Sequence, residues 1–183
     1  MSTYRLDKLF SPRSVAVIGA SPREKSLGRA VLKNLRRGGF AGEIDLVNPH
    51  YDAIEGVRAV KSYDEQSSAP DLVVIAAPPP AVPSLVATVG QSGAAAAIIL
   101  TAGLGHGPGS LAESCENNAR AAGLRLVGPN CLGVLVPHVK LNASFAALAP
   151  WACRPDLTTS TGLARAAARA ADMNLRASLI DSI

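Results

Sequence analysis

Short apolar runs recur along the chain, each bounded by polar residues or by glycine and proline. The clearest occupy residues 15–18, 72–77 and 94–100, and others that contain one charged residue each occupy 44–47, 57–60 and 124–127. Runs of this length that lack polar alternation are typical of strands buried on both faces of a parallel sheet. The pattern therefore predicts a set of short, buried strands distributed over the first 130 or so residues.

Between these runs the apolar residues recur with helical spacing. Leu27, Val31, Leu32 and Leu35 line one face of a helix that begins near Leu27 and ends at a pair of glycines. We expect further helices over residues 83–89 and 111–122, and a short one over 6–10. Strands that alternate with helices in this way predict an α/β fold, a parallel sheet with helices on both faces.

Each predicted strand ends in an unusual loop. The loops read GASP, NPHY, AAPPP, TAGL and GPNCLG, in chain order. In open parallel sheets the ligand lies outside the carboxyl ends of the strands, where such loops gather. The sequence therefore predicts a binding site along one edge of the sheet.

The first of these loops has the features of a phosphate site. A strand, a glycine turn at Gly19 and a helix start leave free N–H groups and a helix dipole pointing at one place. Ser21 and Ser26 add hydroxyl groups, and Arg23, Lys25 and Arg29 add positive charge. We expect Lys25 and Arg29 to be solvated charges at the helix start rather than fixed phosphate ligands.

A dinucleotide site would have a different pattern. It requires G-x-G-x-x-G after the first strand and an acidic residue after the second. Here Gly19 stands alone until Gly28, and the second strand ends in Asn48-Pro49. The missing acid favours coenzyme A, which carries a phosphate on its ribose. A nucleotide-binding fold with an emptied site remains the alternative.

Composition excludes several classes of protein. The chain has 183 residues, a formal charge of +4 and 4% aromatic residues, and its basic residues are scattered, so we expect no nucleic acid partner. Three cysteines lack any CxxC spacing, and no histidines cluster, so neither disulfides nor a metal site is predicted. With no apolar run long enough for a membrane span and no signal peptide, we expect a cytoplasmic protein without a membrane partner.

Two residues invite a catalytic interpretation. His106 stands in a G-H-G-P-G loop, where we expect an exposed histidine without a chemical role. Cys131 follows a strand, but no histidine or acid is tied to it by the sequence, so a packed cysteine is favoured over a nucleophile. No catalytic residue is predicted.

Six motifs in order carry a resemblance to a known family. They are V-A-V-I-G-A-S at 15–21, V-N-P-H-Y at 47–51, A-A-P-P-P at 76–80, I-L-T-A-G at 99–103, G-P-N-C-L-G at 128–133 and L-N-A-S-F at 141–145. The set resembles the N-terminal CoA-binding domain of NDP-forming acyl-CoA synthetases, such as ADP-forming acetate–CoA ligase, which are related to the succinyl-CoA synthetase alpha subunit. The same module begins bacterial protein lysine acetyltransferases with a GNAT domain.

The resemblance implies a Rossmann-like fold that binds CoA or acyl-CoA, and it implies which residues do so. They are Gly19, Ala20, Ser21 and Ser26 in the first loop, Asn48, Pro49 and His50 in the second, Ala77 and Pro78, then Thr101, Ala102 and Gly103, and finally Asn130 near the thiol end.

The resemblance also implies a domain organisation. Residues 1–150 match the CoA-binding domain, and 151–183 match the truncated start of a second, succinyl-CoA-synthetase-like domain with a partial βαβ unit. The family's phosphohistidine loop and its ATP-grasp domain are not in this sequence, nor is an acetyltransferase domain. We therefore expect that the chain alone binds CoA and catalyses no reaction. We expect it to act as a fragment of a longer protein, as a homo-oligomer or together with an ATP-grasp partner. The rival from another class is a regulatory module that senses acyl-CoA or NAD(H).

Overall fold

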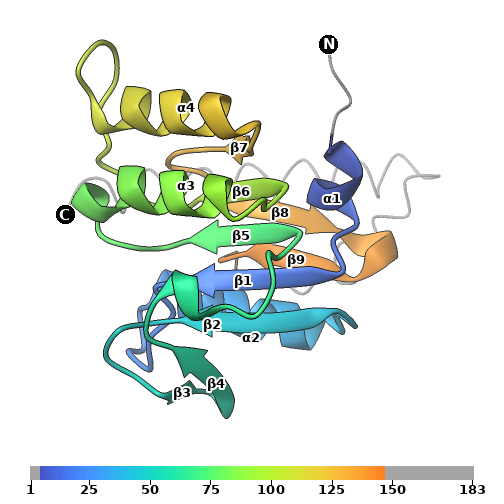
Figure 1. Cartoon of the computed structure of the whole chain (residues 1–183). Coiled ribbons are helices and arrows are strands. Elements are labelled where there is room, and N and C mark those ends of the chain that lie inside the picture. Colours follow the sequence, from blue (N-terminus) through green and yellow to red (C-terminus); the bar gives the residue numbers. More distant parts are fainter. Residues whose placement is uncertain (1–4, 147–183) are drawn as a thin grey trace, which may run out of the picture. The chain divides into compact units, whose positions relative to one another are not determined.

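A seven-stranded sheet lies at the centre of the fold, in the order β3-β4-β2-β1-β5-β6-β7 (Figure 1). The structure is a computed structural model that describes residues 5–146. The strands are β1 (Ser14–Ile18), β2 (Glu43–Val47), β3 (Ala53–Ile54), β4 (Val57–Val60), β5 (Leu72–Ile75), β6 (Ala96–Ile99) and β7 (Arg125–Val127). Neighbouring strands run parallel, except that β3 pairs antiparallel with β4.

The strand order is that of a doubly wound, Rossmann-like sheet. From β1 the chain first builds outward through β2 and β4, and then returns to the other side of β1 to add β5, β6 and β7. The direction of winding reverses between β1 and β5, and ligands of such sheets bind at that reversal. The predicted fold class is therefore confirmed.

Helices cover both faces of the sheet, as predicted. They are α1 (Leu6–Phe10), α2 (Leu27–Gly38), α3 (Val82–Gln91) and α4 (Leu111–Ala122), with 3-10 turns η1 (Tyr63–Glu65), η2 (Pro79–Ala81) and η3 (Pro137–Val139). Alternate residues of the strands feed two separate cores, one shared with α1 and α2 and the other with α3 and α4. All four side chains of β5 are fully buried, which explains why its run of sequence shows no polar alternation.

A two-stranded hairpin, not predicted from the sequence, also packs on the face that α2 covers. It consists of β8 (Gly133–Val136) and β9 (Leu141–Ser144). Alternation of apolar and polar residues in β9 suggests a half-exposed strand, yet all four residues are buried. Their polar groups are satisfied inside: Asn34 of α2 donates to the carbonyl of Ser144 at 2.8 Å, and the Ser144 hydroxyl donates to Asn142 Oδ1 at 2.6 Å.

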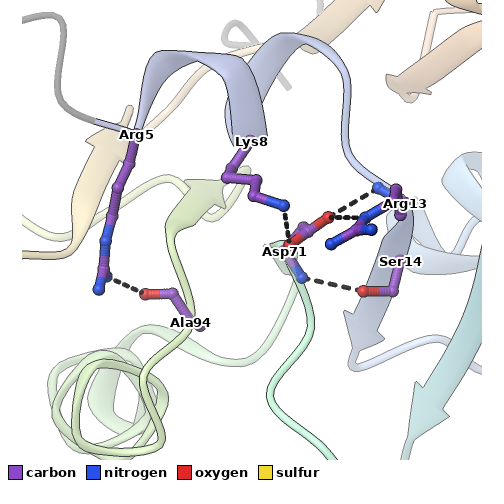
Figure 2. A network of polar contacts seen from close by, with 6 residues as sticks. All are labelled: Arg5, Lys8, Arg13, Ser14, Asp71 and Ala94. Atoms are coloured by element: carbon purple, nitrogen blue, oxygen red, sulfur yellow. Dashed lines mark hydrogen bonds and ion pairs between the residues drawn. The ribbon is translucent and has the colours of Figure 1, made fainter.

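Asp71 fastens α1 to the amino-terminal edge of the sheet (Figure 2). Its carboxylate lies 3.0 Å from Lys8 Nζ and accepts a hydrogen bond from the backbone N–H of Arg13 at 2.8 Å. Its own N–H donates to the Ser14 hydroxyl, and Arg5 reaches the carbonyl of Ala94 nearby. This cluster lies at the edge opposite to the carboxyl ends of the strands, so it is part of the scaffold.

Residues 151–183 lie outside the described part of the chain. The partial βαβ tail and the domain boundary near residue 150 therefore stay predictions.

Candidate functional site

The register of the sheet brings the strand-end loops into one row. Ile18 of β1 pairs with Val47 of β2 on one side and with Ile75 of β5 on the other. The row continues from Val47 to Val60 of β4 and from Ile75 to Ile99 of β6. The loops that follow these residues therefore start level with one another. At about 4.8 Å per strand, the edge from β4 to β7 is roughly 24 Å long.

The first loop is held close to its neighbours by two glycines. Gly19 has φ +89°, and a Cβ there would lie 2.5 Å from the carbonyl oxygen of Ala76 in the loop after β5. A Cβ on Gly28, in the first turn of α2, would lie 2.6 Å from the Cα of Ala20. Gly19 allows the tight turn after β1, and Gly28 allows the close approach of α2 to that turn. The glycines of a G-x-G-x-x-G motif have the same two roles, although Gly19 and Gly28 are nine residues apart.

Ser26 is the N-cap of α2. Its hydroxyl oxygen accepts a hydrogen bond from the backbone N–H of Arg29 at 3.3 Å, which satisfies one of the free groups of the first turn. The first turn of α2 has further N–H groups that no helical carbonyl can accept from, and the positive end of the helix dipole lies at this same end of α2. This geometry suits an anion, as the sequence predicted.

Asn48 holds the second loop to the first. Its side chain is buried, its amide Nδ2 donates to the carbonyl of Ala20 at 2.6 Å, and its Oδ1 accepts from the N–H of His50 at 2.8 Å. Both ends of the amide are thus engaged within the protein. The role the structure gives Asn48 is to position the first two loops, whereas Pro49 and His50 beside it are exposed.

Thr101 holds the loops together on the other side of the switch point. Its buried hydroxyl donates to the carbonyl of Ala77 at 2.7 Å, and its own carbonyl accepts from the N–H of Asn130 at 3.1 Å. Asn130 has φ +55° and is exposed. Ala102 and Gly103 are also exposed. Hydrogen bonds therefore link the loops after β5, β6 and β7 to one another.

A cleft of about 740 Å³ opens at the switch point. Of the predicted site residues it brings together Gly19, Asn48, Pro49, His50, Ala77 and Pro78. The others lie along the same edge outside the cleft: Ala20, Ser21 and Ser26 in the first loop and helix start, and Thr101, Ala102, Gly103 and Asn130 toward β7. A volume of this size suits the nucleoside end of a cofactor.

The cleft has one apolar wall and one charged rim. Ala77, Pro78 and Leu85 supply apolar surface, and the prolines that follow Ala77 carry no N–H donor, so this wall does not suit a phosphate. Burial raises the pKa of Tyr63, so its ring is an uncharged part of the lining. Arg23 from the first loop and Lys61 from the end of β4 contribute positive charge.

Sequence reasoning missed Lys61, Tyr63 and Asp64 as cleft residues. A signal existed, because Lys61 follows directly on the predicted strand at 57–60. That strand had to be placed beside β2, parallel to it, before its end pointed to the site.

The residues with a tempting chemistry have plainer roles. His106 is exposed in its loop, as expected. Cys131 Sγ donates to the carbonyl of Ile99 at 3.4 Å, and burial raises the pKa of its thiol against hydrogen bonds from backbone N–H groups. A thiol of raised pKa is a poor nucleophile, in agreement with the packed cysteine favoured above.

Arg29 differs from expectation. Its Nε lies 2.5 Å from the carboxylate of Glu55 in the β3–β4 turn, which Lys33 also approaches at 3.6 Å. Arg29 is therefore partly buried and paired with a carboxylate of the protein itself, and this ion pair links the β3–β4 turn to α2. Lys25 is exposed.

Within residues 5–146, none of the helices has the length and apolar character needed to cross a membrane. The same residues contain no group of three or more histidine, cysteine, aspartate or glutamate side chains placed to hold a metal ion.

A doubly wound sheet with a glycine turn, a helix start and a cleft at its switch point is typical of nucleotide-binding domains. The particular family follows from comparison: the model of the CoA binding domain family matches residues 13–137, and the chain belongs to that family.

Two curated relatives are ADP-forming acetate–CoA ligases. The enzyme of Methanocaldococcus jannaschii is 39% identical over 148 residues, which are 80% of this chain and 21% of the relative. The alpha subunit of the ligase II of Pyrococcus furiosus is 38% identical over 147 residues, 79% of this chain and 32% of that subunit. The chain thus spans about a fifth to a third of the length of these relatives. The resemblance stated from six motifs is confirmed.

A solved structure shows the same fold. It is the dinucleotide forming acetyl-coenzyme A synthetase 1 of Ca. Korarchaeum cryptofilum in complex with phosphate and ADP. The match has a TM-score of 0.72 at 31% identity and covers 77% of this chain and 31% of that one.

Proposed function

We propose that this chain binds CoA or acyl-CoA as the nucleotide-binding part of an ADP-forming acyl-CoA synthetase of the acetate–CoA ligase type. The observation that carries the proposal is the cleft at the switch point, where a helix start suited to anions adjoins a wall suited to an adenosine group. Family membership and the names of the relatives support the same ligand.

The sheet edge suits a long, linear ligand. The diphosphate of CoA would bind at Gly19, Ser21 and the start of α2, and the adenosine would enter the cleft beside Ala77 and Pro78. The pantetheine arm would then run toward β7, past Thr101, Ala102 and Gly103 to Asn130. From β1 to β7 this path is roughly 14 Å by strand spacing. CoA itself supplies the thiol, and the chain's part is to bind and orient it.

No residue of this chain is proposed to be catalytic. In the proposal the acid–CoA ligation depends on further domains or an ATP-grasp partner chain. The same binding role would serve an acetyltransferase fused to such a module.

The test is isothermal titration calorimetry of the full chain with CoA, acetyl-CoA, dephospho-CoA and NAD. We expect CoA to bind with micromolar affinity, about −8 kcal/mol, and NAD to bind far more weakly. Binding of NAD without CoA would favour the regulatory module that senses NAD(H). No binding of either would contradict the proposal for this chain.

A matched pair of variants locates the site. Arg23→Met removes a cation from the cleft, whereas Arg37→Met removes an exposed cation from the far end of α2. We expect the first to weaken CoA binding by about tenfold and the second to leave it within twofold. Equal effects of the two variants would mean that only the net charge matters.

A further inference from the structure

Lys61 stands level with the phosphate turn on the same sheet edge. Val60, Val47 and Ile18 form one row, so the residues that follow them, Lys61, Asn48 and Gly19, also start level. Two strand spacings, about 10 Å, separate the backbone of Lys61 from that of Gly19. The edge therefore carries two separate positive centres, one at the helix start with Arg23 and the other at Lys61.

Within residues 5–146 the ammonium group of Lys61 forms one ion pair, with an exposed carboxylate, while its backbone N–H donates to Glu65 Oε2 at 3.4 Å. Its Nζ lies 2.6 Å from Asp52 Oδ1, and the two side chains are 45% and 91% exposed. The hydrogen bond from Lys61 lowers the pKa of Asp52, so this carboxylate is charged at neutral pH. An ion pair exposed to this degree contributes little net stability. A phosphate monoester with nearly two charges would therefore replace the carboxylate as the partner of the ammonium group.

The other ionisable groups that line the cleft do not duplicate this centre. Arg23 comes from the loop after β1, on the diphosphate side, and His50 is exposed beside Asn48. Asp64 is the acidic residue of the lining, and its carboxylate accepts from the Ser62 hydroxyl at 3.4 Å within its own turn. Of the permanent cations of the cleft, Lys61 is thus the one that lies away from the glycine turn.

We propose that Lys61 selects for a ligand that carries a phosphate monoester on its ribose, and that Asp52 holds the ammonium group in place until that phosphate displaces it. The inference rests on the proposed function and deepens it. The resemblance implied His50 of the second loop as a site residue, and Lys61, which follows β4, adds a permanent cation to the lining of the same cleft.

The test compares CoA with dephospho-CoA, which lacks only the monoester, by calorimetry of the full chain. Lys61→Met should weaken CoA binding about tenfold or more and change dephospho-CoA binding less than twofold. Asp52→Asn should strengthen CoA binding two- to threefold, because it removes a competing anion. Lys33→Met, another half-exposed lysine with a carboxylate partner but outside the cleft, is the control and should change neither.

Each outcome decides between distinct failures. If the unmodified chain binds CoA and Lys61→Met changes both ligands equally or neither, the selectivity role of Lys61 is wrong while CoA binding stands. If Asp52→Asn weakens CoA binding as much as Lys61→Met does, the carboxylate supports the ligand rather than competing with it, and the displacement is wrong. If the unmodified chain binds neither ligand, the proposed function itself fails.

Discussion

At the scale of single residues, two buried side chains hold the strand-end loops beside the cleft together. The Asn48 amide and the Thr101 hydroxyl each donate to a carbonyl oxygen of a neighbouring loop. These hydrogen bonds fix the positions of the loops at the carboxyl edge of the sheet. Removing one of these hydrogen bonds between loops should therefore reduce stability as well as binding.

Asn48→Ala tests this role. It deletes the hydrogen bond to the carbonyl of Ala20 and leaves that buried group without its partner, so we expect a loss of about 2 kcal/mol in the free energy of unfolding. Urea denaturation measures it, with Asn117→Ala on the exposed side of α4 as the control, expected to stay within about 0.5 kcal/mol. Equal stability of the two variants would show that the hydrogen bond from Asn48 does not stabilise the fold.

Gly19 and Gly107 form a natural matched pair. Both have positive φ, +89° and +77°, but only at Gly19 does a Cβ meet a neighbour, the carbonyl oxygen of Ala76 at 2.5 Å. Alanine at 107 should cost about 1 kcal/mol for the backbone conformation alone. Alanine at 19 should cost about 3 kcal/mol, because the loop after β5 must also shift, and CoA binding should be lost with it. A similar cost at both positions in urea denaturation would show that the loop gives way easily.

At the scale of elements, α1 is held to the sheet by Asp71 (Figure 2). Burial raises the pKa of this carboxyl, but the hydrogen bond from the Arg13 N–H and the contact with Lys8 outweigh it, so the pKa is lowered overall. A lowered pKa in the folded state stabilises the fold above the unfolded pKa near 3.9, and this contribution is lost as pH falls through the folded value.

Asp71→Asn should therefore unfold more easily at pH 7 by about 1 kcal/mol, and this deficit should shrink below about pH 4. Urea denaturation at pH 3, 4, 5 and 7 gives the comparison, with the exposed Glu116→Gln as the control. If the loss of stability in Asp71→Asn persisted unchanged to pH 3, it would not come from the missing carboxylate charge. The hydrogen-bonding geometry of the asparagine amide would then be the cause.

The elements that the sequence predicted are those with a continuous local pattern. The strands predicted at 15–18 and 72–77 correspond to β1 and β5, and the helix predicted over 111–122 corresponds to α4. The hairpin of β8 and β9 was missed because the burial of β9 depends on α2, more than a hundred residues earlier in the chain, whose Asn34 donates to the backbone carbonyl of Ser144. Likewise β3 is two residues long and has no pattern of its own.

At the scale of the whole molecule, the location of the cleft could be predicted from the sequence, but its full lining could not. Alternating strands and helices imply a switch point, and the loop sequences predict the edge of the sheet at which a ligand would bind. Lys61 and Asp64 belong to the site only because β4 lies beside β2, which is a property of strand order and not of any local sequence. The charged residues at the rim of the cleft could therefore be identified only from the structure.

Amide hydrogen exchange of the full chain, with and without saturating CoA, would test whether CoA binds along the carboxyl edge of the sheet. We predict slower exchange in the loops after β1, β2, β4, β5, β6 and β7, with little change at the opposite edge around Arg13, Gly42 and Asp71. Protection concentrated at that opposite edge, with the glycine turn unchanged, would mean that CoA does not bind at the carboxyl edge.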